Sequence, residues 1–221
     1  MFGGMTAAPI VVVSPHRDDA VMSCWSVLSG PCQVTVVNVF TGAPAAGVLA
    51  HWDRGPGVAD SAARVRQRAL EDRSALASAG RAPLDLGLVE AVHGGGRPLL
   101  DEVLWPYLAD AEAVYVTAGV ALFEHQVNLE HGLVRDTVLA LRPDARLYAD
   151  QPYCGFRGDL ELPPALAAGR VGWRSDLSTA QRTAKAEAIR CYAGEVPKLE
   201  RVFGRFAAPD CLSHEVFWAP V

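Results

Sequence analysis

Short runs of β-branched and other apolar residues recur along the chain, separated by longer segments of helical character. Four runs stand out, at residues 9–13, 33–40, 113–117 and 145–149. Continuous apolar runs of this kind are typical of strands that are buried on both faces of a parallel sheet. A stretch without Gly or Pro, residues 20–29, separates the first two runs and predicts a helix. Strand, helix and strand in this order predict a parallel unit with a right-handed crossover.

Helical patterns fill most of the remaining chain. They lie at residues 59–79, 99–109, 131–141 and 179–193, the second with an interruption expected near Pro106, and residues 84–92 predict a further short strand. No internal repeat or low-complexity linker divides the sequence. We therefore expect one domain over residues 1–221 with an α/β fold, a Rossmann-like three-layer sandwich around a mostly parallel sheet.

Polar residues gather where two of the predicted strands end. His16, Asp18 and Asp19 follow the first strand, and His125 and His131 follow the strand at residues 113–117. The carboxyl ends of parallel strands lie at one edge of a sheet, where ligands bind. Imidazole and carboxylate groups are ordinary ligands of a divalent metal, and a second carboxylate is available as a base. The pattern therefore predicts a metal site built from His and Asp. The alternative is that an aspartate simply caps the helix and that His16 is an ordinary loop histidine.

The segment after the second strand, residues 41–57, lies at the same predicted edge. Long loops in this position are often functional. Its Trp52 and Arg54 could stack on and hydrogen-bond a polar ligand, or the segment could be a solvated loop pinned by Trp52. Tyr153 follows the strand at residues 145–149 and is a further candidate at this edge. We expect structural roles for the remaining histidines, His51, His93 and His214.

Composition argues against several classes of partner. The net charge is −5 and no block of Lys and Arg occurs, which gives no sign of a nucleic-acid surface. The apolar runs are far shorter than the ~20 residues of a membrane span, and no signal-peptide pattern is present. Five cysteines, an odd number without a CxxC pair, indicate reduced thiols. We therefore expect a cytoplasmic protein without nucleic-acid or membrane partners, of unspecified oligomeric state.

These residues resemble a known family, the PIG-L/LmbE-type zinc-dependent N-acetylglucosaminyl deacetylases. The hallmark of that family is a first strand that runs into a His-x-Asp-Asp motif, here His16-Arg17-Asp18-Asp19. Further matches follow in order at residues 20–24, 52–53, 68–72, 148–153 and 185–192. The resemblance extends over nearly the whole chain.

The resemblance implies hydrolysis of an N-acetyl group on a small N-acetylated sugar or glycoside in secondary metabolism. It implies that His16, Asp19 and His131 hold Zn²⁺ and that Asp18 is the general base. Zinc held in this way activates water and polarises the acetyl oxygen. Iron(II), cobalt and manganese are alternatives for the same ligand set.

Substrate contacts are expected from His125 or Tyr153 at the acetyl oxygen and from Arg54 at a hydroxyl or anionic group. The chain departs from the family pattern just before His131, because Asn128 stands where the family has a histidine and Glu130 where it has Asp. His125 could replace that histidine.

Two other functions remain open at this stage. One is a metal-dependent hydrolase of another amide or ester. The other is a non-catalytic protein that keeps the fold, for which the departure at Asn128 is the argument.

Overall fold

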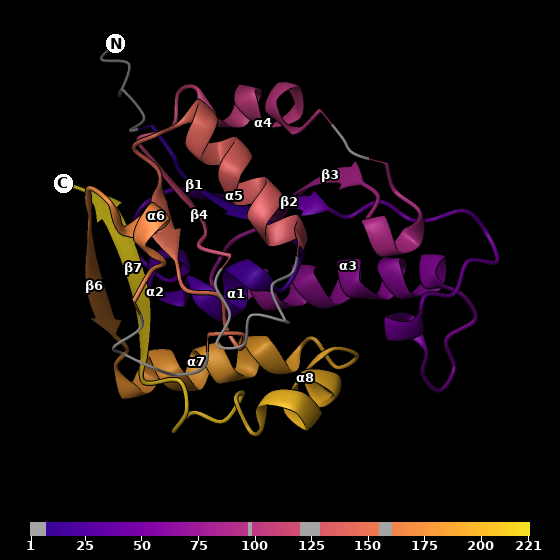
Figure 1. The fold of residues 1–221 in the computed structure, drawn as a ribbon. Coiled ribbons are helices and arrows are strands. Elements are labelled where there is room, and N and C mark those ends of the chain that lie inside the picture. Colours follow the sequence, from indigo (N-terminus) through magenta and orange to yellow (C-terminus); the bar gives the residue numbers. More distant parts are fainter. Residues whose placement is uncertain (1–7, 97–98, 120–128, 155–160) are drawn as a thin grey trace, which may run out of the picture.

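A seven-stranded sheet forms the centre of the protein (Figure 1). The structure is a computed structural model that describes residues 8–96, 99–119, 129–154 and 161–221. The strands are β1 Ile10–Ser14, β2 Val34–Phe40, β3 Pro83–Leu88, β4 Ala113–Thr117, β5 Arg146–Tyr148, β6 Arg170–Asp176 and β7 His214–Pro220. Their order in the sheet is β3-β2-β1-β4-β5-β7-β6.

Five neighbouring strands, from β3 to β5, pair in parallel. β7 pairs antiparallel with both β5 and β6 at the other edge. The predicted mostly parallel sheet is therefore confirmed. β6 escaped prediction because its residues are mostly exposed and form no apolar run.

Helices cover both faces of the sheet, which gives the three expected layers (Figure 1). They are α1 Asp19–Ser23, α2 Trp25–Leu28, α3 Ser61–Ala77, α4 Leu100–Leu108, α5 Leu129–Leu141, α6 Pro164–Ala167, α7 Thr179–Arg190 and α8 Val196–Phe203, with short 3₁₀ turns η1 His51–Asp53 and η2 Ala91–His93. One apolar core lies between the sheet and α1, α2, α3, α7 and α8. A second lies between the sheet and α4, α5 and α6.

Two helix predictions need correction. The helix expected at residues 20–29 is split at Cys24, because the carboxylate of Glu215 accepts the backbone N–H groups of Trp25 and Ser26 and lets a second short helix begin. The helix around Pro106 is not interrupted. Pro106 lies on its exposed side, while Leu residues at every fourth position are buried and hold the helix to the core.

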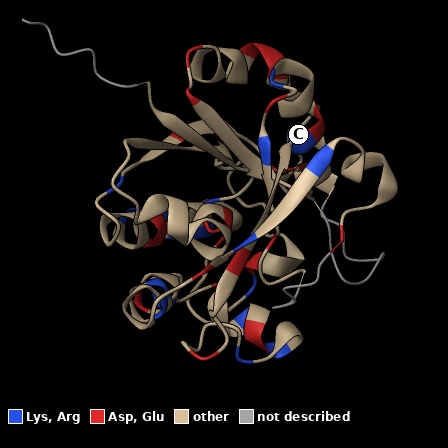
Figure 2. Ribbon diagram, turned by 90° about the vertical axis from the view of Figure 1, so that its left-hand side faces the viewer, with Lys and Arg blue, Asp and Glu red and all other residues tan. Residues whose placement is uncertain are grey.

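The strand order reverses between β1 and β4, since the chain places β2 and β3 on one side of β1 and β4 and β5 on the other. Open α/β sheets bind ligands beyond the carboxyl ends of the strands at such a point. Basic and acidic residues are interspersed along the helices and strands in the view of Figure 2. Among the described residues, no helix has both the length and the apolar character needed to cross a membrane.

Candidate metal centre and active site

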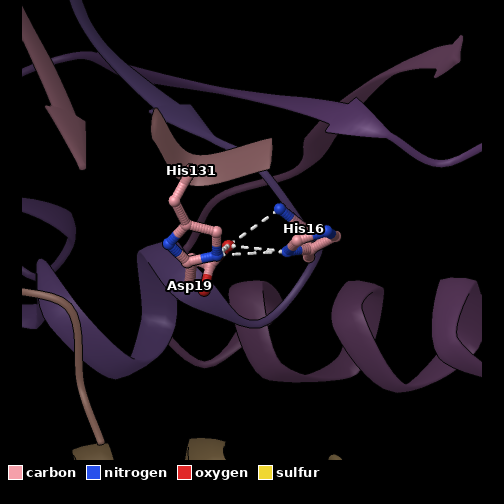
Figure 3. A group of neighbouring side chains, drawn as sticks. All are labelled: His16, Asp19 and His131. Atoms are coloured by element: carbon pink, nitrogen blue, oxygen red, sulfur yellow. Dashed lines mark hydrogen bonds and ion pairs between the residues drawn. The ribbon is translucent and has the colours of Figure 1, made fainter. Parts of the chain in front are cut away.

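Three side chains from two distant parts of the chain meet beyond the ends of β1 and β4 (Figure 3). His16 comes from the turn after β1, Asp19 from the first residue of α1, and His131 from α5. His16 Nδ1 lies 3.2 Å from His131 Nε2. Asp19 Oδ2 lies 3.4 Å from each of these nitrogens. The structure therefore brings together the three residues that the sequence predicts as metal ligands.

The turn after β1 is held in place by local hydrogen bonds. The hydroxyl of Ser14, the last residue of the strand, donates to the carbonyl of His16 at 2.5 Å and accepts from the backbone N–H of Ala20 at 3.0 Å. The backbone N–H of His16 donates to Asp19 Oδ2 at 2.8 Å. These bonds close the strand-to-helix connection over Asp18 and hold the carboxylate of Asp19 against the backbone of His16.

Buried hydrogen bonds orient the imidazole of His131. Its Nδ1 lies 2.7 Å from Oδ1 of Asp150, which follows β5. Asp150 also accepts from the backbone N–H of Gly119 at 2.8 Å and from the hydroxyl of Thr117. A carboxylate can only accept hydrogen bonds, so we assign the proton of the neutral ring to Nδ1. The Nε2 lone pair of His131 then points toward His16 and Asp19.

The imidazole of His16 has a comparable arrangement. Its Nε2 lies 2.8 Å from Oε2 of Glu130, which places the proton on Nε2 and the lone pair on Nδ1. Two imidazole lone pairs and a carboxylate oxygen therefore face one another. Such a donor set repels itself unless a cation or a proton lies between its members, and its chemistry fits a divalent metal.

The electrostatics of the centre also favour positive charge. Burial lowers the pKa of His16, but the carboxylates of Asp19 and Glu130 outweigh it and raise that pKa well above its usual value. For His131, burial is again outweighed, here by Asp19 and Asp150, and its pKa is raised. Burial opposes ionisation of Asp19, yet the two imidazoles hold its pKa below the usual value.

Asp18 lies beside this centre on the wall of a pocket. Its side chain makes no capping hydrogen bond to α1, which removes the capping alternative for this residue. Burial, with the nearby charges of Asp19 and Glu195, raises the pKa of Asp18 to about 7. A carboxyl group with such a pKa exchanges protons readily near neutral pH.

The pocket has a volume of about 600 Å³. One part of its wall is polar and includes His16, Asp18, Asp53, Arg68, Glu90, Glu130 and Glu195. Another part is apolar or aromatic and includes Phe40, Trp52, Val92, Leu129, Tyr153, Leu199, Val202 and Phe203. The pocket can therefore accept a ligand with both polar and apolar groups.

The sequence predictions for the pocket wall have mixed outcomes. Tyr153 lies in the wall, and its ring meets the edge of the His131 ring at a centroid distance of 5.7 Å. Arg54 is exposed and does not line the pocket, because η1 directs Trp52 inward and the chain leaves in extended conformation at Arg54. His125 and Asn128 lie outside the described residues.

Arg68 lines the pocket, where the sequence analysis expects Arg54 to contact the substrate. Its guanidinium lies 2.9 Å from Glu195, 3.0 Å from Asp53 and 3.6 Å from Glu90. On the same helix, Glu71 lies 3.9 Å from Arg64. Ion pairs with three carboxylates fix Arg68 as part of the pocket wall.

Several residues of the site escaped the sequence analysis. Asp150 carried a usable signal, because it directly follows a predicted strand at the same edge of the sheet. Glu195 and Phe203 carried none, since they come after the last segment that matches the family, residues 185–192, and belong to no motif. His93, for which a structural role is expected, is buried, lies 2.6 Å from Asp53 and also lines the pocket.

Comparison with known proteins gives the family context. No protein-family model matches the chain. The 2'-N-acetylparomamine deacetylase of Streptomyces fradiae is 30% identical over 177 residues, which cover 72% of this chain and 63% of that relative. The proteins to which this chain is similar are deacetylases of the PIG-L/LmbE type. The predicted resemblance is therefore confirmed, although the chain spans less than two thirds of this curated relative.

Solved structures of the PIG-L/LmbE type share the fold. The A40926 pseudoaglycone deacetylase Dbv21 is 24% identical with a TM-score of 0.74, and the match covers 98% of each chain. The zinc-inhibited form of the teicoplanin deacetylase Orf2 is 22% identical with a TM-score of 0.71, covering 96% of this chain and 98% of that one. These likenesses confirm the α/β fold of the chain.

Proposed function

We propose that the protein is a metal-dependent hydrolase that removes an N-acetyl group from an N-acetylglucosaminyl-type sugar or glycoside during the biosynthesis of an antibiotic or related secondary metabolite. The observation that carries the proposal is the convergence of His16, Asp19 and His131 at the edge of a pocket that His16 and Asp18 line. The deacetylases to which the chain is similar support this reaction class.

In this proposal His16, Asp19 and His131 hold a Zn²⁺ ion, with other divalent metals as alternatives. When bound there, the metal supplies Lewis acidity, which makes water a stronger nucleophile and polarises the acetyl carbonyl. Three protein ligands are the usual number in a catalytic zinc site.

Asp18 moves the protons. Its carboxylate accepts a proton from the attacking water and then donates it to the nitrogen of the leaving amine, so that acetate and a free amine are formed. The position of Asp18 next to Asp19 supports this role, because adjacent residues cannot easily both bind the same ion, and Asp18 is left to face the pocket.

Tyr153 is the proposed hydrogen-bond donor to the acetyl oxygen. Burial raises the pKa of its hydroxyl well above the usual value, so the group keeps its proton. A donor directed at the oxygen that gains negative charge stabilises the transition state of acyl transfer. His125 remains a predicted contributor. Arg54 has no part in the proposed site, because it is exposed and does not line the pocket.

We further propose that the reaction takes place in the cytoplasm. All five cysteines are free. Reduced cysteines are typical of proteins from that compartment.

Acetate release tests the proposal. The protein is purified, stripped of metal and incubated with N-acetylglucosaminyl compounds, other acyl amines and esters, with and without Zn²⁺. We expect zinc-dependent acetate release with N-acetylated sugars. Release only from esters or non-sugar amides would support the broader hydrolase function, and no release with any substrate would support the non-catalytic alternative.

A further inference from the structure

Glu130 connects three segments that form the site. It lies in the first turn of α5, directly before His131. Its Oε2 lies 2.8 Å from His16 Nε2, and its Oε1 accepts the backbone N–H of Ala91 at 2.7 Å. The side chain is only 13% exposed. One carboxylate thus joins the turn after β1 and the 3₁₀ turn η2 to α5.

The contact with His16 decides which nitrogen of that ring carries the proton. A carboxylate provides only acceptors, so the proton of neutral His16 lies on Nε2. The lone pair then lies on Nδ1, the nitrogen that faces His131 and Asp19. If the proton were on Nδ1, it would point into the space between the three groups and His16 could not bind a cation there.

We propose that Glu130 is a positioning residue that fixes the tautomer and the ring orientation of His16, and thereby the affinity of the three-residue centre for its metal. The inference rests on the proposed metal centre and extends it to a residue that does not contact the ion. Carboxylates that hold a metal-binding histidine in this way contribute strongly to metal affinity.

The bond to Ala91 offers a different role for the same residue. Glu90 and Val92, on either side of Ala91, line the pocket, so Glu130 could matter only because it anchors η2. The two roles are separable. Replacing Ala91 with Pro removes the N–H group that Glu130 accepts and leaves the contact with His16. Glu90 has φ −58 and ψ 147, a conformation that a following proline favours.

Zinc affinity and the tautomer of His16 test the inference in the full chain. Zinc affinity is measured by competition with a chromogenic chelator. The tautomer is measured by long-range ¹H–¹⁵N NMR on the zinc-free protein, at a pH above the raised pKa of His16, where the ring is neutral. We expect Glu130→Gln to weaken zinc binding by about 10- to 100-fold and to change the ¹⁵N pattern of His16. Ala91→Pro and the surface control Glu112→Gln should stay within about twofold of the wild type.

Three results would overturn the inference. In the first, Glu130→Gln keeps wild-type affinity and the wild-type tautomer. In the second, Ala91→Pro weakens zinc binding as much as Glu130→Gln does. In the third, wild-type His16 carries its proton on Nδ1, which can be measured even if the variant does not fold. A wild-type protein that binds no zinc is a distinct result, because it contradicts the proposed function itself along with this inference.

Discussion

A fully buried ion pair between α7 and β7 gives a sharp prediction about stability. Lys185 of α7 lies 2.6 Å from Oε1 of Glu215 in β7, and their side chains are 1% and 0% exposed. The same carboxylate accepts the backbone N–H of Trp25 at 2.6 Å, and the N–H and hydroxyl of Ser26 at 2.8 Å and 2.6 Å. Glu215 therefore joins α7 and β7 to α2, the short helix that comes after α1.

The contacts set the size of the effect of Glu215→Gln. Four donors point at two oxygens, and glutamine replaces one oxygen with an NH₂ group that donates. Either orientation of the amide sets donors against donors, and the Lys185 ammonium is left without a counter-charge in the interior. Breaking a buried pair in this way costs about 3–5 kcal/mol, a large part of the roughly 5–15 kcal/mol that stabilises a typical domain.

The matched variant is Lys185→Met, whose uncharged, unbranched side chain is one heavy atom shorter. Glu215 then retains three hydrogen bonds from Trp25 and Ser26, so we expect a smaller loss of about 1–3 kcal/mol. The double variant should lose less than the sum of the two single losses, because no unpaired charge remains. Urea unfolding followed by circular dichroism measures each value. A loss below about 1 kcal/mol for Glu215→Gln, or strict additivity, would refute the reasoning.

Three further predictions concern single carboxyl groups. Asp18→Asn should lower kcat for acetate release by at least ~10²-fold with the zinc content unchanged, and an unaltered kcat would remove Asp18 as the base. Asp150→Asn should weaken zinc binding about 10- to 100-fold, because the new amide NH₂ group would either face the Gly119 N–H or favour the wrong tautomer of His131. The control is Asp144→Asn at an exposed position, and equal zinc affinities in the two variants would contradict this account. Burial raises the pKa of Asp72 to about 7, against the opposing effect of hydrogen bonds from Tyr192 and Asn38. The folded state therefore holds a proton that the unfolded state releases, so the free energy of unfolding should fall as pH rises from about 4 to 7. Asp72→Asn should flatten this decline. An identical pH profile in the variant and the wild type would exclude Asp72 as the source of the decline.

The sequence was most informative where geometry follows from chain order. Apolar runs marked the parallel strands, and parallel strands present their carboxyl ends at one edge. For that reason His16 and His131 could be expected near each other although 115 positions separate them. The fold and the family resemblance were therefore accessible without coordinates.

Contacts between segments remote in sequence were not accessible. The break at Cys24 depends on Glu215, which comes from the last strand. The choice of Arg68 over Arg54 depends on the path of the loop before α3, which no periodicity encodes. The sequence presented Glu130 as a departure from a family pattern, whereas the structure gives it a contact with His16 that only the placement of α5 against the turn after β1 creates.

X-ray absorption at the zinc edge tests the central claim most directly. The wild-type protein and His131→Ala are compared after loading with zinc. The account predicts one zinc per wild-type chain, with two imidazole nitrogens at about 2.0–2.1 Å, and loss of the metal or of one imidazole in the variant. A wild-type protein without bound zinc, or a zinc site with the same imidazole count in both proteins, would contradict it.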